Sequence, residues 1–118
     1  MAGEDLKKRT KAFALRVIKL TNALPRERSA DIIGRQLLRC GTSVGANYRS
    51  ACRAKSAADF IAKMTIVEEE ADESLYWMEL LVESNLVPQV KLADLMKEAD
   101  EIVSIIVASI KTARSHKV

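Results

Sequence analysis

The feature that most limits the fold of this chain is an apolar repeat with the 3.6-residue period of an α-helix, which runs through four successive segments. The repeat predicts four helices, over residues 4–23, 29–53, 56–85 and 88–115. Long helices joined by short connections pack as antiparallel neighbours. We therefore expect an all-α protein, an antiparallel up-down-up-down four-helix bundle in which the whole chain, 1–118, forms a single domain.

Short local signals mark the expected helix ends. Pro25 follows the first apolar segment and ends it, and Pro88 stands where the fourth helix begins. Ser29 and Ser56 are the expected N-caps of the second and third helices. Asp59, three residues after Ser56, completes a variant of the capping box.

The composition excludes several classes of protein. Aromatic residues make up only 4% of the chain, which has Gly 4 and Pro 2, too few for a β-sandwich or β-barrel. No apolar run is long enough to span a membrane, and charged side chains interrupt the N-terminal segment, so we expect neither a transmembrane helix nor a signal peptide.

Cys40 and Cys52 lie about 18 Å apart along one expected helix, beyond disulfide reach. We therefore expect buried, reduced thiols in a cytoplasmic protein.

The chemically reactive residues form no catalytic pattern. His116 is the only histidine, so a Ser/His/Asp or Cys/His arrangement is not expected, and the chain has no Cys-x-x-Cys motif. The acidic run at residues 68–73 lacks the paired Glu-x-x-His motifs of di-metal bundles. We expect no enzyme activity and no catalytic residues, no metal, no cofactor, no small-molecule substrate and no membrane partner.

Charge is divided unevenly along the chain. Residues 1–55 hold 13 Lys and Arg against 4 Asp and Glu, whereas residues 56–118 hold 6 against 12. Five arginines of the second helix share one face, opposite its apolar residues: Arg28, Arg35, Arg39, Arg49 and Arg53. Guanidinium groups bind phosphate oxyanions bidentately, so this face predicts contact with RNA or another nucleic acid. The alternative is that the stripe pairs with carboxylates of a neighbouring helix or subunit.

The second helix also carries amides and glycines within its apolar half. Buried amides need hydrogen-bond partners, so we expect Gln36 and Asn47 to be satisfied, Asn47 by a carboxylate of the third helix. On that helix Glu69 and Glu73, one turn apart, are expected to pair with an arginine or with Asn47. Three glycines predict either the close approach of another backbone or a kink: Gly34, Gly41 and Gly45.

The third helix shows a second apolar band beside its core stripe. The band contains Ile66, Trp77 and Leu80, with Glu73 among them. A bundle helix needs only one apolar face, so this band predicts an interface with a second copy of the chain. The alternative is that Trp77 belongs to the core of its own bundle.

Six short stretches of the chain resemble one known family. They are residues 24–26, 36–39, 42–48, 53–56, 59–60 and 68–77. Their pattern resembles the four-helix-bundle family named for the protein encoded in 23S rRNA intervening sequences, also labelled S23 ribosomal protein. The resemblance implies a ring-shaped homopentamer. Five residues match polar positions of that family, which we interpret as structural: Arg39, Ser43, Asn47, Glu69 and Glu73. The last four of these, together with Gln36, are the polar residues that we expect to be buried.

The resemblance extends to a related basic pentamer, the accessory variability determinant of diversity-generating retroelements, which works with a reverse transcriptase and binds nucleic acid. Together these features predict a non-enzymatic homo-oligomer that acts as an assembly or adaptor for RNA, or for a nucleic-acid enzyme, through the arginine face. The competing hypothesis is a purely protein-interaction or structural module, in which the arginine stripe pairs between helices or subunits.

Overall fold

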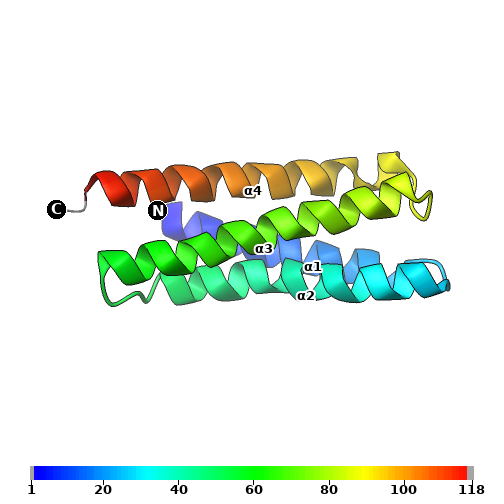
Figure 1. Ribbon diagram of the computed structural model, residues 1–118, viewed down its shortest axis with the longest axis horizontal. Coiled ribbons are helices and arrows are strands. Elements are labelled where there is room, and N and C mark those ends of the chain that lie inside the picture. Colours follow the sequence, from blue (N-terminus) through cyan, green and yellow to red (C-terminus); the bar gives the residue numbers. More distant parts are fainter. Residues whose placement is uncertain (1, 117–118) are drawn as a thin grey trace.

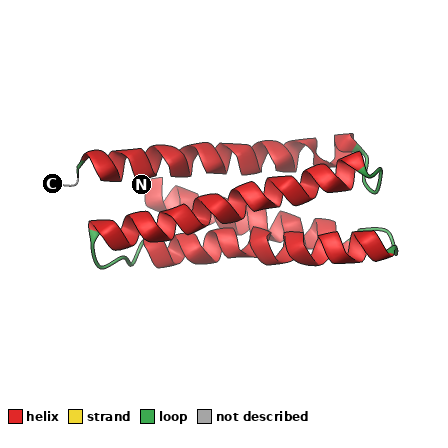
Figure 2. Ribbon diagram, viewed as in Figure 1, coloured by secondary structure: helices red, strands yellow, loops and turns green. Residues whose placement is uncertain are grey.

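Four long helices make up nearly all of the computed structural model, which describes residues 2–116. They are α1 (Ala2–Asn22), α2 (Arg28–Ala51), α3 (Ala57–Glu83) and α4 (Gln89–Ser115). Successive helices run in opposite directions, and the start of α1 and the end of α4 lie at the same end of the bundle (Figure 1). The connections are short loops at the two ends of a rod measuring 51 × 21 × 20 Å (Figure 2). The predicted all-α up-down-up-down four-helix bundle is confirmed.

Side chains fix the start of α3 but not that of α2. The Ser56 hydroxyl accepts the Asp59 amide N–H at 3.0 Å, and the Asp59 carboxylate accepts the Lys55 amide N–H at 3.0 Å. This reciprocal pair confirms the predicted capping-box variant. The predicted N-cap at Ser29 is wrong, because α2 begins one residue earlier and Glu27 occupies the N-cap position without a side-chain hydrogen bond.

The end of α3 is a Schellman motif. Asn85 adopts the left-handed conformation with φ 63°, and its amide N–H donates to the Val82 carbonyl. The Leu86 amide donates to the Leu81 carbonyl at 3.0 Å, which satisfies a second carbonyl at the helix end. Pro88 then precedes the first residue of α4.

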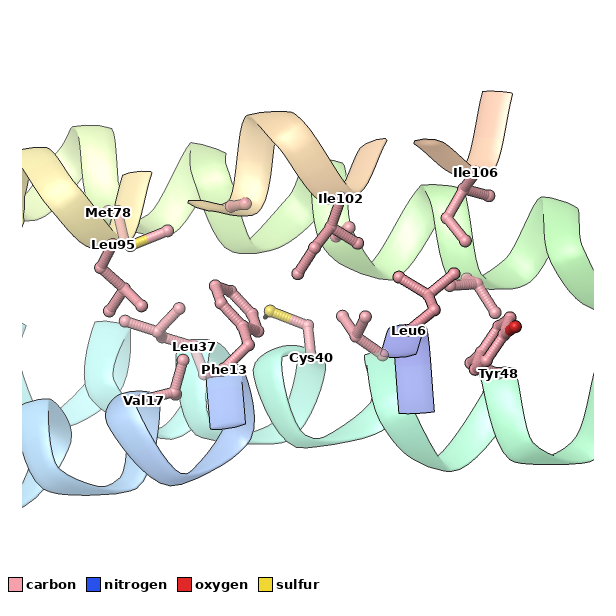
Figure 3. Close-up of a cluster of buried hydrophobic side chains, with 14 of the residues drawn as sticks. Leu6, Phe13, Val17, Leu37, Cys40, Tyr48, Met78, Leu95, Ile102 and Ile106 are labelled. Atoms are coloured by element: carbon pink, nitrogen blue, oxygen red, sulfur yellow. Dashed lines mark hydrogen bonds between the residues drawn. The ribbon is translucent and has the colours of Figure 1, made fainter. Parts of the chain in front are cut away.

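All four helices contribute side chains to one apolar core. Figure 3 shows them converging between the helices: Phe13 and Val17 from α1, Leu37 and Cys40 from α2, Met78 from α3, and Leu95, Ile102 and Ile106 from α4. Cys40 is buried, and its burial raises the pKa of the thiol. The expectation that Cys52 is buried is wrong: α2 ends at Ala51, and Cys52 is exposed in the turn that follows.

Glycine lets α1 and α2 pack closely. A Cβ atom added at Gly41 would lie 2.9 Å from both methyl carbons of Val17, and one at Gly45 would lie 3.2 Å from the Thr10 hydroxyl oxygen. Both distances are shorter than ordinary van der Waals contacts between heavy atoms. Since α2 is continuous from Arg28 to Ala51, the glycines serve the close approach of α1, one of the two predicted outcomes, and not a break in the helix.

An ion pair links the first helix to the last. The Arg9 guanidinium donates to both carboxylate oxygens of Glu98, at 3.0 and 2.7 Å, and contacts Glu101 at 3.4 Å. A two-point guanidinium–carboxylate contact of this kind fixes geometry as well as supplying attraction. It therefore holds α1 beside α4. Within residues 2–116, none of the helices combines the length and the apolar character that crossing a membrane requires.

Alanine substitutions at two of the glycines test the close packing of α1 on α2. Alanine favours a helix over glycine by about 1 kcal/mol, but the Cβ of Gly41→Ala meets the stiff, branched Val17, and overpacking of this kind costs about 1–3 kcal/mol. At Gly34 the nearest atom is the flexible end of Leu24, 2.8 Å away. In urea denaturation we expect Gly41→Ala to lower the free energy of unfolding by about 1 kcal/mol, and Gly34→Ala to leave it unchanged or raise it. Equal stabilisation by both would contradict the packing described.

Candidate nucleic-acid interface

The charge imbalance of the sequence becomes a division between neighbouring helices. The basic residues of the N-terminal half lie mainly on α1 and α2, which pack side by side. Helix α3 carries 8 Asp and Glu and a single lysine, Lys63. The bundle therefore has a basic side formed by two helices and an acidic helix adjoining it.

The five arginines predicted to share one face of the second helix are all exposed, and they differ in their partners. Arg53 lies in the turn that follows α2. Arg35 pairs with Asp31 one turn away on its own helix, with its Nε 3.2 Å from a carboxylate oxygen. Arg39 pairs with α3. Within residues 2–116, ion pairs are absent for Arg28, Arg49 and Arg53.

Arg39 departs from the predicted nucleic-acid face. Its guanidinium lies 3.3 Å from a Glu70 oxygen and donates a short hydrogen bond to Glu73. The negative charge of Glu70 and the hydrogen bond to Glu73 raise the pKa of Arg39. The same Glu73 oxygen accepts the Trp77 indole N–H at 3.0 Å. Arg39 therefore follows the alternative stated from the sequence, pairing with carboxylates of a neighbouring helix, because it lies on the edge of α2 that faces α3.

Another group of basic residues comes together between α1 and α2. An open groove near the chain ends is lined by five cations, which we call the groove cluster: Lys7, Lys8, Lys11, Arg49 and Arg53. Small residues also line the groove, among them Gly45 and Ala46. One carboxylate, Glu4, lines it as well and lies 3.3 Å from the Lys7 ammonium. Ammonium and guanidinium donors facing an open groove are suited to binding an extended polyanion.

The three lysines of α1 in the groove cluster were not predicted from the sequence to belong to the site. Their spacing places them on one helical flank, but nothing in α1 alone says which helix lies beside that flank. The answer comes from the antiparallel contacts of α1 with Gly41 and Gly45, which bring the start of α1 to the end of α2. The glycines of the second helix were the available signal, because they predicted the close approach of another backbone or a kink, but they did not say that the approaching backbone is α1.

A second hollow lies at the opposite end of the same two helices. It is lined in part by three arginines, which we call the loop cluster: Arg26, Arg28 and Arg35. Glu27 and Asp31 also line it, so its charge is more nearly balanced than that of the groove cluster. The α1–α2 side of the bundle thus carries cations near both of its ends.

The second apolar band of α3 is only partly open. Ile66 is 43% exposed, whereas Trp77 and Leu80 are half-buried and Trp77 packs partly against the core. Tyr76 is 52% exposed, and its ring packs against the Trp77 ring in a T-shaped arrangement with 5.1 Å between the ring centroids. The band is therefore shared between the bundle itself and the surface.

The polar residues expected to be buried lie nearer the surface than predicted. Gln36, Ser43, Asn47 and Glu73 are half-buried, and the predicted burial of Glu69 is wrong, since Glu69 is exposed. Asn47 does not reach a carboxylate of α3, because its amide donates to the Ser43 carbonyl of its own helix at 2.9 Å.

Two other polar side chains are fully buried among the residues described, Thr10 and Ser74. Each hydroxyl donates to a carbonyl one turn earlier in its own helix, at 2.8 Å. The expected pairing of Glu73 with an arginine is present, with Arg39 as its partner. In residues 2–116 no group of three or more His, Cys, Asp and Glu side chains is arranged to hold a metal ion.

A protein family and a solved structure are among the known proteins to which the chain is similar. A family model described as "23S rRNA-intervening sequence protein" matches residues 4–108. A crystal structure of a protein with unknown function from the S23 ribosomal protein family of Bacteroides thetaiotaomicron is similar at 35% sequence identity, covering 94% of this chain and 99% of that one, with a TM-score of 0.87. No curated protein matches the chain.

A double-mutant cycle tests whether Arg39 is held by α3. We expect Arg39→Gln and Glu73→Gln to show a coupling free energy of about 0.2–1 kcal/mol, the usual range for a solvent-exposed ion pair. The coupling should shrink at high salt, because screening weakens exposed pairs. The same cycle between Arg49 and Glu73 is the matched control and should give no coupling. Equal values for the two cycles would contradict the pairing.

Proposed function

The chain belongs to the 23S rRNA-intervening sequence protein family, and from this premise we propose that it is a non-enzymatic bundle that binds RNA through the groove cluster between α1 and α2. The solved relative from that family is itself described as a protein of unknown function. The proposal therefore rests on the chemistry of this chain's own surface. We also propose that the protein is cytoplasmic.

The observation that carries the proposal is that positively charged side chains lie on both sides of the α1–α2 groove. Four cations line one groove: Lys8 and Lys11 of α1, Arg49 of α2, and Arg53 in the turn that follows α2. None of them forms an ion pair within residues 2–116. Cations gathered in one groove repel each other, and a phosphate backbone relieves that repulsion while releasing its own counterions. The groove thus favours a polyanionic ligand.

Self-assembly is the second part of the proposal, and its surface is the edge between α2 and α3. The Arg39–Glu73 contact shows which residues of the antiparallel helices α2 and α3 lie at the same height along the bundle axis. Ile32 lies seven residues before Arg39, and Leu80 lies seven residues after Glu73, so both lie on the same edge and at the same level. Ile32 is 55% exposed. With Ile66 and Tyr76 it leaves apolar surface along this edge that a second copy of the chain would cover.

The proposed assembly is a homo-oligomer, and the pentameric ring implied by the family resemblance is its expected form. Ring closure uses a heterologous contact, in which two different surfaces of neighbouring copies meet. The α2–α3 edge lies on the opposite flank of α2 from the groove that faces α1, so a copy bound at that edge leaves the groove cluster open. An oligomer would then present several grooves and could act as an adaptor for RNA or for a nucleic-acid enzyme.

RNA binding is tested with a variant that neutralises the groove, Lys8→Gln/Lys11→Gln/Arg49→Gln/Arg53→Gln. In a mobility-shift assay with structured RNA, the wild type should bind at low salt and weaken as salt rises. The variant should bind RNA at least about tenfold more weakly. The slope of log affinity against log salt concentration should become smaller by about one for each phosphate contact removed.

The matched control removes exposed lysines from α4, Lys91→Gln/Lys97→Gln/Lys111→Gln, and should change RNA affinity less than about twofold. Absence of binding by the wild type at low salt would refute the RNA part of the proposal. If RNA has no effect while high salt dissociates the oligomer, the purely structural module, with its basic side paired to the next subunit, is the better account.

Light scattering tests the assembly surface. The wild type is expected to have a mass several times the protomer mass of 13.1 kDa, with a pentamer as the expected form. Ile32→Glu/Ile66→Glu places charges at the α2–α3 edge and should lower the mass to that of one protomer. Val90→Glu, at a residue that is 84% exposed on α4, is the control and should leave the mass unchanged. A monomeric wild type, or a double variant of unchanged mass, would contradict this surface.

A further inference from the structure

The basic side of the bundle offers no aromatic side chain to a nucleic-acid base. Helices α1 and α2 contain two aromatic residues, Phe13 and Tyr48, and both are buried in the core. The exposed Tyr76 and the half-buried Trp77 lie on the acidic helix α3. Proteins that bind single strands stack successive bases on aromatic side chains, at about 1–3 kcal/mol per base. The α1–α2 side therefore lacks the usual means of holding a single strand.

The cations of this side are held at a fixed spacing. The groove cluster (Lys7, Lys8, Lys11, Arg49 and Arg53) lies near the chain ends, and the loop cluster (Arg26, Arg28 and Arg35) lies near the α1–α2 connection. Arg35 and Arg49 are 14 residues apart on one continuous helix, which places them about 21 Å apart along its axis. Arg39, which stands between them in sequence, is turned toward α3.

Two rigidly spaced clusters favour a rigid ligand. A flexible single strand that spans both clusters loses conformational freedom, whereas a duplex is already extended and loses little on binding. Double-stranded RNA is recognised largely by its shape and by its phosphates and 2′-hydroxyls, without base stacking. The cations of α1 and α2 supply contacts of that kind.

The acidic helix limits how far a nucleic acid can follow the surface. Helix α3 lies directly beside α2 and carries 8 Asp and Glu, so a strand that wrapped around the bundle would meet carboxylates. Contact is therefore confined to one side of the rod. One side of a straight double helix matches that geometry.

From these observations we infer that the ligand of the α1–α2 side is a double-stranded segment of RNA, bound along its backbone by the groove cluster and the loop cluster together. The inference rests on the proposed RNA-binding function and narrows it to a class of RNA. Binding is independent of base sequence, because the contacts are made to phosphates.

The test compares a 16-base-pair RNA duplex, about the length that double-stranded RNA-binding modules span, with an unstructured 16-nucleotide single strand. Affinities are measured by fluorescence anisotropy with the wild-type chain at one low salt concentration. The duplex is expected to bind at least about tenfold more tightly. A single strand that binds as tightly as the duplex overturns this inference and leaves RNA binding intact. Absence of binding by both probes refutes the proposed function itself.

A second arm tests the two-cluster contact with the variant Arg26→Gln/Arg28→Gln/Arg35→Gln. Loss of the loop cluster should weaken duplex binding about tenfold, and single-strand binding by less than about twofold, because a flexible strand engages the groove cluster alone. The α4 lysine variant Lys91→Gln/Lys97→Gln/Lys111→Gln is again the control, and circular dichroism verifies that each variant is folded. Duplex affinity that does not respond to loss of the loop cluster overturns the two-cluster contact.

Discussion

The close packing of α1 against α2 is the contact on which the rest of the structure depends. Both helices are basic, so their charges oppose the approach that Gly41 and Gly45 permit. Apolar burial around Phe13 and Val17 outweighs this repulsion, which solvent screens at the surface. The result is a line of cations along two adjacent helices, with Lys11 of one and Arg49 of the other lining the same groove. Opposite charges at this junction would stabilise the bundle more than like charges do.

Two other helix pairs, α1–α4 and α2–α3, have such complementary charges at their contacts. Arg9 joins α1 to α4 through Glu98, and Arg39 joins α2 to α3 through Glu70 and Glu73. In both places a cation faces a carboxylate of the neighbouring helix, as expected where an ion pair stabilises the contact between two helices. The α1–α2 groove differs from these two junctions, because cations of both helices line it. This contrast within one molecule separates the structural arginines from those that we assign to a ligand.

The fold could be predicted from the sequence because the apolar repeat, the caps and the helix stops all indicate the same four helices. The candidate site could be predicted only in part. A helical projection shows which residues share a face but not which neighbour each flank meets, so it grouped Arg39 with Arg49 although one faces α3 and the other faces α1. It also failed to find Lys11, whose relevance depends on the α1–α2 contact. Cys52 was expected inside the bundle because the projected helix continued past Ala51, where α2 ends.

The same exposed thiol offers the most direct test that the α1–α2 groove is the ligand site. Cys52 lies between Arg49 and Arg53 in sequence, and the other cysteine, Cys40, is buried. The measurement is the rate at which a neutral maleimide alkylates Cys52, with and without a saturating RNA duplex. The account predicts that the bound duplex slows the reaction several-fold and that high salt restores the rate. An alkylation rate that stays the same while RNA is shown to be bound would contradict it.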